Sequence, residues 1–258
     1  MDTVPFTLGT PASGHHTLGL IVLKFDETLE QDFRRLFPSR DLALYTSRVP
    51  SGAEVTTDTL QEMSQTLPAS AALFPPAARF DVVGYGCTSG TTMIGAAKVA
   101  ALVEQGVETP AVTDPLTAAI AACRALNITR LGMVTPYVAE VSLPVQHAFE
   151  AAGISVPALV SFGEAGEENV ARITAESVKS AALKVGQQAV DAVFLSCTNL
   201  QTLDVIADLE ATLNKPVLSS NSVLAWHMAQ LSGAPLSPEA PGQLFAHSSA
   251  KNATNVAP

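Results

Sequence analysis

The chain has 258 residues, enough for one large domain or two smaller ones. Its 47% hydrophobic and 15% charged residues can build a substantial core and argue against a disordered chain. The formal net charge of −10, from 14 Lys and Arg against 24 Asp and Glu, disfavours binding to nucleic acid or anionic membranes. The 3 cysteines, without C-x2-C spacing, exclude a disulfide scaffold and a zinc ribbon, so no metal site is expected.

The two ends of the chain differ from the region between them. Residues 1–16 are rich in Pro, Gly, Ser and Thr, which is typical of a flexible leader, and they lack the basic and apolar stretches of a secretory signal. Residues 237–258 form an expected C-terminal extension. No run reaches the ~18 consecutive apolar residues of a membrane span. We therefore expect a cytoplasmic protein whose thiols stay reduced.

Short apolar runs alternate with stretches of helical periodicity along the chain. The runs are continuous rather than alternating, which predicts strands buried on both faces of a parallel sheet, at residues 17–23, 80–85, 130–135, 192–196 and 216–219. Helices are predicted at residues 27–36, 57–69, 91–105, 115–126, 143–152, 175–185, 200–213 and 222–230. This alternation indicates a doubly wound α/β fold with right-handed crossovers.

Three landmarks occur twice, in the same order and with similar offsets. Offsets of 113, 110 and 106 residues separate Gly19 from Gly132, Cys87 from Cys197, and Pro110 from Pro216. Agreement at three landmarks in register indicates an internal duplication. We therefore predict two similar lobes, one of residues 17–115 with a C-terminal helix near 222–230, and one of residues 116–221.

Cys87 and Cys197 each follow a predicted buried strand and precede a predicted helix. Ligands bind at the carboxyl ends of strands in open α/β sheets. A helix N-terminus is expected to lower the pKa of a thiol and to favour the thiolate. Small polar residues follow each cysteine and suit a pocket for a carboxylate, namely Thr88 and Ser89 in the first lobe and Thr198 and Asn199 in the second.

Two thiols that face each other across a cleft suit two reactions. In a cofactor-independent racemase, one thiolate removes a proton α to a carboxylate and the other thiol returns one to the opposite face. In the alternative, a thiolate adds to a double bond and the second thiol acts as the acid. Cysteine is also a small buried hydrophobe at strand ends, and Cys123, which has no matched partner, is interpreted in this way.

Several segments together resemble a known family of enzymes. The segments YGCTSGTTMIG, RLGMVTPY and LSCTNLQTLDVI resemble the aspartate/glutamate racemase superfamily, from about Leu18 to about Gln230. The closest branch holds maleate cis–trans isomerases, arylmalonate decarboxylases and ectoine-utilisation racemase-like proteins. This resemblance implies two flavodoxin-like lobes with parallel sheets, related by a pseudo-twofold axis, with the active site between them. It also implies no metal, no organic cofactor and a homodimer.

Individual residues discriminate within this branch. Arylmalonate decarboxylases have glycine at the position of Cys87, so decarboxylation is disfavoured. Maleate isomerases bind substrate carboxylates with an asparagine, a tyrosine and a later asparagine, and Tyr137 and Asn169 match the last two. Asp26 stands at the position of the first asparagine, where it would repel a substrate carboxylate by ~1 kcal/mol at 4 Å even in bulk water. An aspartate there suits a substrate that carries an amino or amide N–H group.

The resemblance is strongest to the ectoine-utilisation proteins, which implies a small amino-acid derivative as substrate. The leading hypothesis is therefore a two-cysteine racemase or isomerase acting on a small carboxylate or amino-acid derivative. The alternatives are a maleate cis–trans isomerase, an arylmalonate-type decarboxylase and a two-lobed module that binds a ligand without chemistry.

Four further residues have two interpretations each. Tyr137 either donates its hydroxyl to the substrate or is structural. Asp26 either contacts the substrate or caps the helix that follows it, and both roles are compatible. Lys24 is a candidate cation for Asp26 or for a substrate carboxylate. His227 either faces the cleft or packs beside its neighbouring tryptophan, and packing is favoured.

Overall fold

The computed structural model describes residues 1–8 and 16–247. Parts of the predicted leader (9–15) and of the predicted C-terminal extension (248–258) lie outside the described residues. The strands are β1 (His16–Leu23), β2 (Leu42–Val49), β3 (Val82–Gly86), β4 (Val112–Thr113), β5 (Arg130–Thr135), β6 (Ser155–Ser161), β7 (Ala192–Leu195) and β8 (Val217–Ser219). The helices are α1 (Leu29–Leu36), α2 (Thr57–Ala71), α3 (Thr88–Ile94), α4 (Ala96–Glu104), α5 (Pro115–Ala125), α6 (Ala139–Ala151), α7 (Glu167–Val170), α8 (Ala175–Gly186), the 3-10 helix η1 (Leu203–Val205), α9 (Ile206–Leu213) and α10 (Ser220–Ser232).

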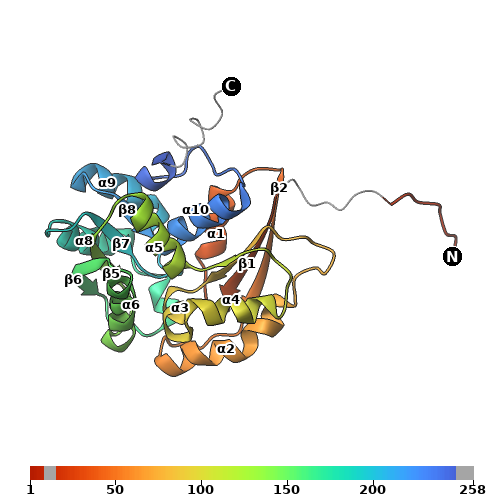
Figure 1. Ribbon diagram of the computed structural model, residues 1–258, viewed down its shortest axis with the longest axis horizontal. Coiled ribbons are helices and arrows are strands. Elements are labelled where there is room, and N and C mark those ends of the chain that lie inside the picture. Colours follow the sequence, from red (N-terminus) through yellow and green to blue (C-terminus); the bar gives the residue numbers. More distant parts are fainter. Residues whose placement is uncertain (9–15, 248–258) are drawn as a thin grey trace.

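The strands form two sheets with the same internal order. One sheet runs β2-β1-β3-β4 and the other β6-β5-β7-β8, and every pair of neighbours is parallel. The sheets lie in two lobes that stand side by side in Figure 1. Strands β1 to β4 therefore correspond in order to strands β5 to β8. The predicted α/β class with two similar, parallel-stranded lobes is confirmed.

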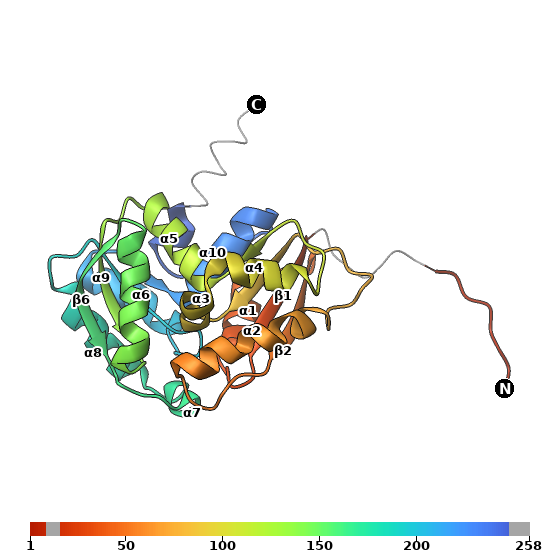
Figure 2. The ribbon, with the colours of Figure 1, turned by 60° about the horizontal axis from the view of Figure 1, so that its bottom comes forward.

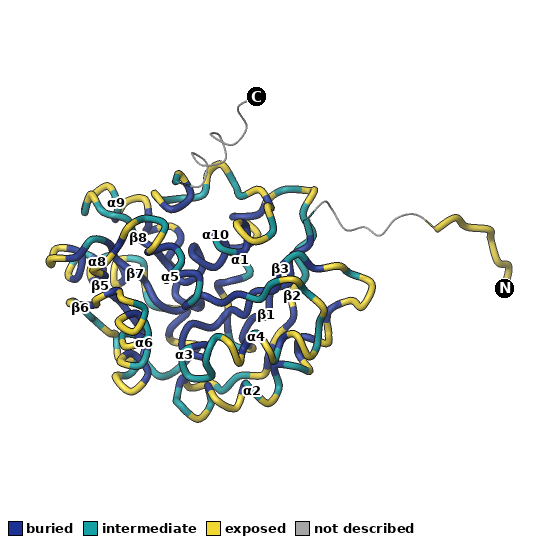
Figure 3. Tube along the Cα trace, in the orientation of Figure 1, coloured by how far each residue is buried: buried dark blue, intermediate teal, exposed yellow. Residues whose placement is uncertain are grey.

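The central strands carry the core, and the edge strands were harder to predict. All residues of β3 and β7 are buried, and dark tube fills the middle of each lobe in Figure 3. Strands β2, β4 and β6 were missed. Strands β2 and β6 lie at sheet edges and mix buried with exposed residues, so they lack the continuous apolar run. Pro157 within β6 is tolerated because an edge strand leaves one row of N–H groups unpaired.

Several predicted helices have other bounds in the structure, and the helix expected at 143–152 already begins at Ala139 as α6. The helix expected at 91–105 is divided into α3 and α4 at Gly95, whose φ of 94° lies in the region that favours glycine. The helix expected at 200–213 begins only with η1 and α9, so residues 198–202 form a loop. The short helix α7 was not predicted.

The C-terminal helix α10 packs against elements of both halves of the chain. It contacts β1, β3 and α1, and also α5 and β8. Figure 2 shows α5 and α10 over the middle of the molecule. A Cβ atom at Gly84 would lie 2.6 Å from Sδ of Met228, so β3 and α10 approach closely at this glycine. The boundaries drawn between the lobes from the sequence stay a prediction.

The described part of the C-terminal extension folds back onto the body. The Ser237 N–H donates to the Leu36 carbonyl at 2.7 Å, and Leu244 and Phe245 are buried. Within the described ranges, none of the helices has the length and apolar character needed to span a membrane.

A substitution at Gly86, directly before Cys87, tests how tightly the end of β3 is packed against α1. A Cβ atom there would lie 2.3 Å from Cδ2 of Leu29, which is fully buried at the start of α1. We expect Gly86→Ala to lower the free energy of unfolding by about 1–3 kcal/mol, because a packed core does not accommodate the methyl group. Urea denaturation would measure the loss, with the exposed α4 substitution Ala97→Ser as the control. Equal stabilities of the two variants would contradict the expectation.

Candidate active site

Cys87 lies at the junction of β3 and α3. It is 3% exposed and occupies the N-cap position of α3, where its Sγ accepts the Gly90 N–H at 3.1 Å. The Ser89 hydroxyl lies 3.7 Å from the sulfur, and the Tyr85 hydroxyl is a further hydrogen-bond partner. A Cβ atom at Gly90 would meet both the Tyr85 hydroxyl at 2.7 Å and Sγ at 2.8 Å, so only glycine leaves room for this arrangement.

Cys197 follows β7 in a different local geometry. Its φ of 117° is unusual for a residue with a side chain and costs on the order of 1–3 kcal/mol. A loop follows it rather than the helix that the sequence predicted. Its backbone N–H donates to the Ser220 hydroxyl at 2.9 Å, and the Tyr137 hydroxyl is a hydrogen-bond partner of its sulfur. These contacts hold the strained backbone and orient the thiol.

Hydroxyl groups join the two cysteine loops directly. The Ser220 hydroxyl, which accepts from the Cys197 N–H, also lies 2.8 Å from the Thr88 hydroxyl. The Thr198 hydroxyl donates to the Gly86 carbonyl at 3.2 Å. The predicted residues Thr88 and Thr198 therefore connect the end of β3 to the end of β7, and the structure brings the two loops together.

Glu167 is a buried carboxylate beside both cysteines that the sequence analysis missed. It is 5% exposed, and its charge raises the pKa of Cys87, of Cys197 and of Tyr137. Its own pKa is raised to about 7, first by burial and further by the charge of Asp26, although a hydrogen bond from Asn199 opposes the rise.

The predicted residue Asn169 lies on the outer side of the same short helix. It is exposed, and its side chain donates to Glu164 at 3.1 Å. Glu167 and Val170, three residues apart, face inward instead. Glu167, not Asn169, is thus the α7 residue that faces the cysteines. The three-residue spacing of Glu167 and Val170 could have indicated that both lie on the buried face of a helix. A glutamate among other charged residues is, however, usually interpreted as exposed to solvent.

The loop before α7 is held to the other half of the chain. The Val55 N–H donates to the Ala165 carbonyl at 2.8 Å, and the Glu167 N–H donates to the Ala53 carbonyl at 3.0 Å. This short antiparallel bridge fixes where α7 begins, and so it fixes the inward direction of the Glu167 side chain.

Asp26 caps α1 with one carboxylate oxygen and leaves the other unused. Its Oδ1 accepts the N–H groups of Thr28 at 2.9 Å and Leu29 at 2.8 Å. Its Oδ2 is buried and makes no hydrogen bond of ordinary geometry with any residue in the described ranges. Burial raises the pKa of Asp26, and the backbone N–H groups, the nearby Thr198 hydroxyl and the charge of Arg48 oppose the rise. The capping role expected from the sequence is present, and it occupies only half of the carboxylate.

Lys24 is not the cation that compensates Asp26. It is exposed, and its ammonium lies 5.1 Å from the centre of the Phe25 ring. Arg48 is the cation whose charge reaches Asp26, but its guanidinium donates to the Asp26 main-chain carbonyl at 3.0 Å and pairs with Glu30.

Asn199 connects segments of the site to one another. Its side-chain N–H groups donate to the Glu167 carboxylate at 3.1 Å and to the Glu167 carbonyl at 3.0 Å, and its Oδ1 accepts the Glu27 N–H at 2.9 Å. Its main-chain carbonyl accepts the Thr28 hydroxyl at 2.9 Å. Asn199, predicted to bind substrate, therefore positions Glu167 relative to the loop that follows β1.

Burial makes both thiols weaker acids than an ordinary exposed cysteine. It raises the pKa of Cys87 to about 12, and the hydrogen bonds from Gly90 and Ser89 oppose the rise without reversing it. Burial also raises the pKa of Cys197 well above the ordinary thiol value. The expectation that a helix N-terminus lowers these pKa values is wrong, because desolvation outweighs the α3 terminus at Cys87 and no helix begins at Cys197. Both cysteines are neutral thiols at pH 7.

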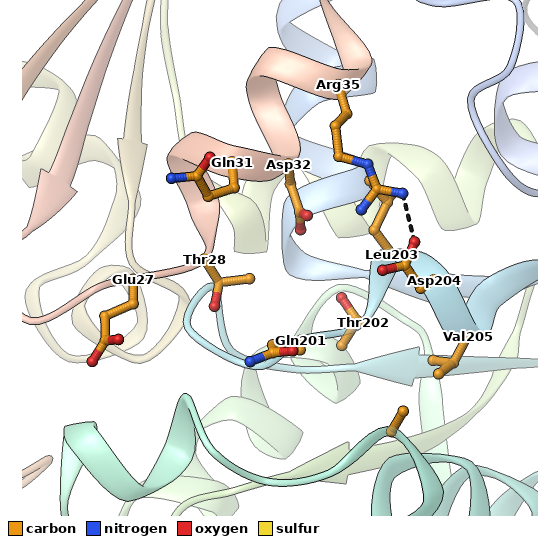
Figure 4. A pocket seen from close by; sticks show the side chains of 11 residues that line it. Glu27, Thr28, Gln31, Asp32, Arg35, Gln201, Thr202, Leu203, Asp204 and Val205 are labelled. Carbon is orange, nitrogen blue, oxygen red and sulfur yellow. Dashed lines mark hydrogen bonds and ion pairs between the residues drawn. The ribbon is translucent and has the colours of Figure 1, made fainter.

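A pocket of about 260 Å³ opens beside this cluster, between α1 and the loop after Cys197 (Figure 4). Thr28, Asp32 and Thr202 line it, and the Arg35–Asp204 ion pair of 2.5 Å lies at its side. Burial raises the pKa of Asp32 to about 6. The pocket reaches the loop that carries Asp26 but is not lined by either cysteine.

The remaining residues singled out from the sequence have structural surroundings. The His227 ring bonds to the Thr113 hydroxyl at 2.7 Å and stacks on Trp226, as expected for a packed histidine. Cys123 is fully buried in α5, as predicted. Among residues 1–8 and 16–247, no group of His, Cys, Asp and Glu side chains is arranged to hold a metal ion.

The structure has two parallel-stranded lobes with a cysteine at corresponding strand ends. Sequence comparison shows which class of α/β proteins shares this arrangement. The family model for arylmalonate decarboxylase matches residues 55–245. The chain therefore belongs to this family, in the racemase-like branch that also contains maleate isomerases. Arylmalonate decarboxylase of Bordetella bronchiseptica is 29% identical over 228 residues, covering 84% of this chain and 90% of that protein. Maleate isomerase of Nocardia farcinica is 28% identical over 132 residues, covering 51% of this chain and 53% of that protein.

Solved structures of the same enzymes share the fold. A variant of the maleate isomerase from Pseudomonas putida S16 with maleate has a TM-score of 0.81 at 24% identity, covering 90% of this chain and 98% of that chain. A liganded arylmalonate decarboxylase, with a glycine changed to cysteine and a cysteine to serine, has a TM-score of 0.79 at 26% identity, covering 89% and 98%. A variant of the Nocardia farcinica maleate cis–trans isomerase carries a covalently bound succinylcysteine intermediate, with a TM-score of 0.77 at 22% identity, covering 89% and 98%.

The different backbones of the two cysteines predict different responses to glycine. At Cys197, with its φ of 117°, we expect the glycine variant to be more stable than the alanine variant by about 1 kcal/mol, because glycine relieves the strain. At Cys87, with an unstrained φ of −150°, we expect the two variants to differ by less than about 0.5 kcal/mol, because the preference for glycine at an N-cap offsets the chain entropy that it adds to the unfolded state. Urea unfolding of the four variants compares them directly. A glycine advantage at Cys197 no larger than at Cys87 would contradict a strained Cys197.

The raised pKa of Glu167 predicts a pH-dependent stability. An ordinary glutamate has a pKa of 4.5, and burial raises that of Glu167 to about 7 in the folded protein. Its contribution is therefore complete below pH 4.5 and is lost as the pH rises through 7, by on the order of 3 kcal/mol. The free energy of unfolding of the wild type should accordingly fall relative to that of Glu167→Gln over this interval. Urea unfolding between pH 4.5 and 8 tests it, with the exposed neighbour Glu168→Gln as a control that keeps the wild-type profile. A constant difference between wild type and Glu167→Gln would refute a raised pKa.

Proposed function

We propose that this protein is a two-cysteine racemase or isomerase that acts on a small carboxylate or amino-acid derivative without a metal or organic cofactor. One observation carries the proposal: Cys87 and Cys197 lie at corresponding strand ends of two similar lobes, on loops joined by hydroxyl groups. Such a pair presents two proton-transferring groups to one substrate from two lobes.

In this mechanism, one cysteine acts as a base and the other as an acid. The thiolate of one removes the proton from the carbon next to the substrate carboxylate, and the thiol of the other donates a proton to the opposite face. Since both are neutral thiols before substrate binds, one must release its proton to solvent as the complex forms, which leaves one thiolate and one thiol. The Gly90 N–H at Cys87 and the Tyr137 hydroxyl at Cys197 stabilise a thiolate as it forms, because each donates a hydrogen bond to sulfur.

Maleate cis–trans isomerisation is the second candidate reaction. The succinylcysteine intermediate of the Nocardia farcinica relative favours it, since a thiolate that adds to a double bond forms such an adduct. The buried carboxylates Asp26 and Glu167 argue against it here, because a doubly charged diacid would meet like charges at the site.

An arylmalonate-type decarboxylase is a third candidate, favoured by the family match. It would release carbon dioxide and need only Cys197. A binding module without chemistry would need neither thiol. The substrate of ectoine-utilisation type, the homodimer and the cytoplasmic location expected from the sequence stay predictions.

Replacing each cysteine in turn tests the proposed function. We expect Cys87→Ala and Cys197→Ala each to lower turnover by on the order of 100-fold or more, because each removes a proton-transferring group. Deuterium incorporation from heavy water at the α-carbon, measured over amino-acid derivatives, unsaturated diacids and arylmalonates, gives the rate and the reaction type. Cys123→Ala, in the core of α5, is the matched control and should retain the wild-type rate. Full activity of both site variants would overturn the proposal, and carbon dioxide release that depends on Cys197 alone would replace it with decarboxylation.

A further inference from the structure

We propose that Asp26 and Glu167 together bind a positively charged nitrogen of the substrate, an ammonium group, beside the two cysteines. The inference rests on the proposed function, because it names the substrate class for the same site. It makes Asp26 and Glu167 the residues that determine specificity, and it favours a free amino acid over its acylated form and over a plain diacid.

The two carboxylates reach the site from different parts of the chain. Asp26 follows β1, and Glu167 begins α7, yet both are buried, with exposed fractions of 3% and 5%. The charge of Asp26 acts on Glu167, and the charges of both act on Cys197. Asn199 connects the two segments, since it donates to the Glu167 carboxylate and accepts from the Glu27 N–H next to Asp26. Asp26 and Glu167 are therefore two buried carboxylates that are connected through Asn199 and whose charges both act on Cys197.

One buried oxygen of these carboxylates has no donor of ordinary geometry among the described residues. Oδ1 of Asp26 accepts two backbone N–H groups, whereas Oδ2 has no such partner, although the Thr198 hydroxyl lies near the carboxylate. Oε2 of Glu167 accepts the Asn199 side chain. A buried oxygen left without a donor is costly, so native structures rarely keep one without a reason. An ammonium group supplies three N–H donors and fits between two carboxylates.

In the described part of the chain, no cation is paired with these carboxylates: no Lys or Arg side chain donates a hydrogen bond to either one. The Arg48 charge reaches Asp26, but its guanidinium bonds to main-chain carbonyls and to Glu30, and the Lys24 ammonium lies over Phe25. Two buried carboxylates without a paired cation repel each other, and a substrate ammonium would remove that repulsion.

The same cation would promote the chemistry at the thiols. The Glu167 charge is one of the causes that raise the pKa of Cys87 and of Cys197. An ammonium that neutralises this charge favours the thiolate, so binding of the substrate helps to create the base that acts on it. A diacid without an amino group would add negative charge and oppose the same step.

Calorimetric titration of the full-length protein with matched ligand series tests the proposal. The series are aspartate, N-acetylaspartate and succinate, and glutamate, N-acetylglutamate and glutarate, in which the ammonium becomes an amide and then a hydrogen. In at least one series we expect the amino acid to bind about tenfold or more tighter than the other two members, as for a charge-assisted hydrogen bond. If no member with an ammonium is preferred, or if the N-acetyl form binds as tightly, the proposal is overturned.

Two conservative variants assign the preference to the two carboxylates. Glu167→Gln keeps an acceptor for Asn199, and Asp26→Asn keeps an acceptor for the two N–H groups at the start of α1, so both variants preserve the local hydrogen bonds. We expect the preference for the ammonium form to fall to within about threefold in each variant. Glu168→Gln, exposed on the same helix, should retain it. A preference unchanged in both carboxylate variants would overturn the assignment.

Turnover separates this inference from the proposed function. If Cys87→Ala and Cys197→Ala abolish turnover of a diacid while no ammonium preference exists, the inference fails and the proposed function stands. If the preference exists and depends on Glu167 and Asp26 but turnover survives both cysteine replacements, the proposed function fails and the ammonium site stands.

Discussion

The contact between the two cysteine loops is the constraint on which the rest of the site depends. The Ser220 hydroxyl accepts from the Cys197 backbone and bonds to Thr88, and the Thr198 hydroxyl donates to the strand end before Cys87. Because these bonds are buried, they hold the loops that follow β3 and β7, which belong to different sheets, against each other in the protein interior. Cys197, whose N–H makes one of these bonds, has the strained φ of 117°. The chain after Cys197 forms a loop instead of a helix. In this loop, Asn199 hydrogen-bonds to residues 27 and 28, which follow β1.

The burial of the two joined loops also determines the protonation state of the cysteines. Desolvation raises the pKa of both thiols, so the protein without substrate holds two neutral sulfurs. It also raises the pKa of Glu167 to about 7, close to the working range of a cell. A neutral thiol is a weaker nucleophile than a thiolate, so in the proposed reaction the charge brought by the substrate would have to favour the thiolate.

Most of the fold could be predicted from the sequence, because the central strands and the duplication leave patterns in it. The strand at Arg130–Thr135 was predicted with its observed bounds, since residues 131–134 form a continuous apolar run and are all buried. Strands β2 and β6 were not, because one face of each meets solvent and their composition is mixed. The cysteines and Asp26 were identified from position and resemblance. Glu167 was not, because its burial depends on a bridge to residues 53–55, more than 100 positions away, which no local pattern contains.

Racemisation, the proposed reaction, needs symmetry in one part of a site and asymmetry in another. The corresponding strands β3 and β7 each end near a cysteine, and a reaction that moves a proton between opposite faces requires such a pair of thiols. The loops after the corresponding first strands differ, since Asp26 follows β1 whereas Tyr137 follows β5. The substituents of the reacting carbon must stay bound while its configuration inverts. Because these substituents differ chemically, different protein groups are needed to hold them in one orientation. In the proposed reaction, the asymmetric pair of Asp26 and Glu167 would orient the substrate, while the duplicated cysteines would leave both directions of proton transfer open.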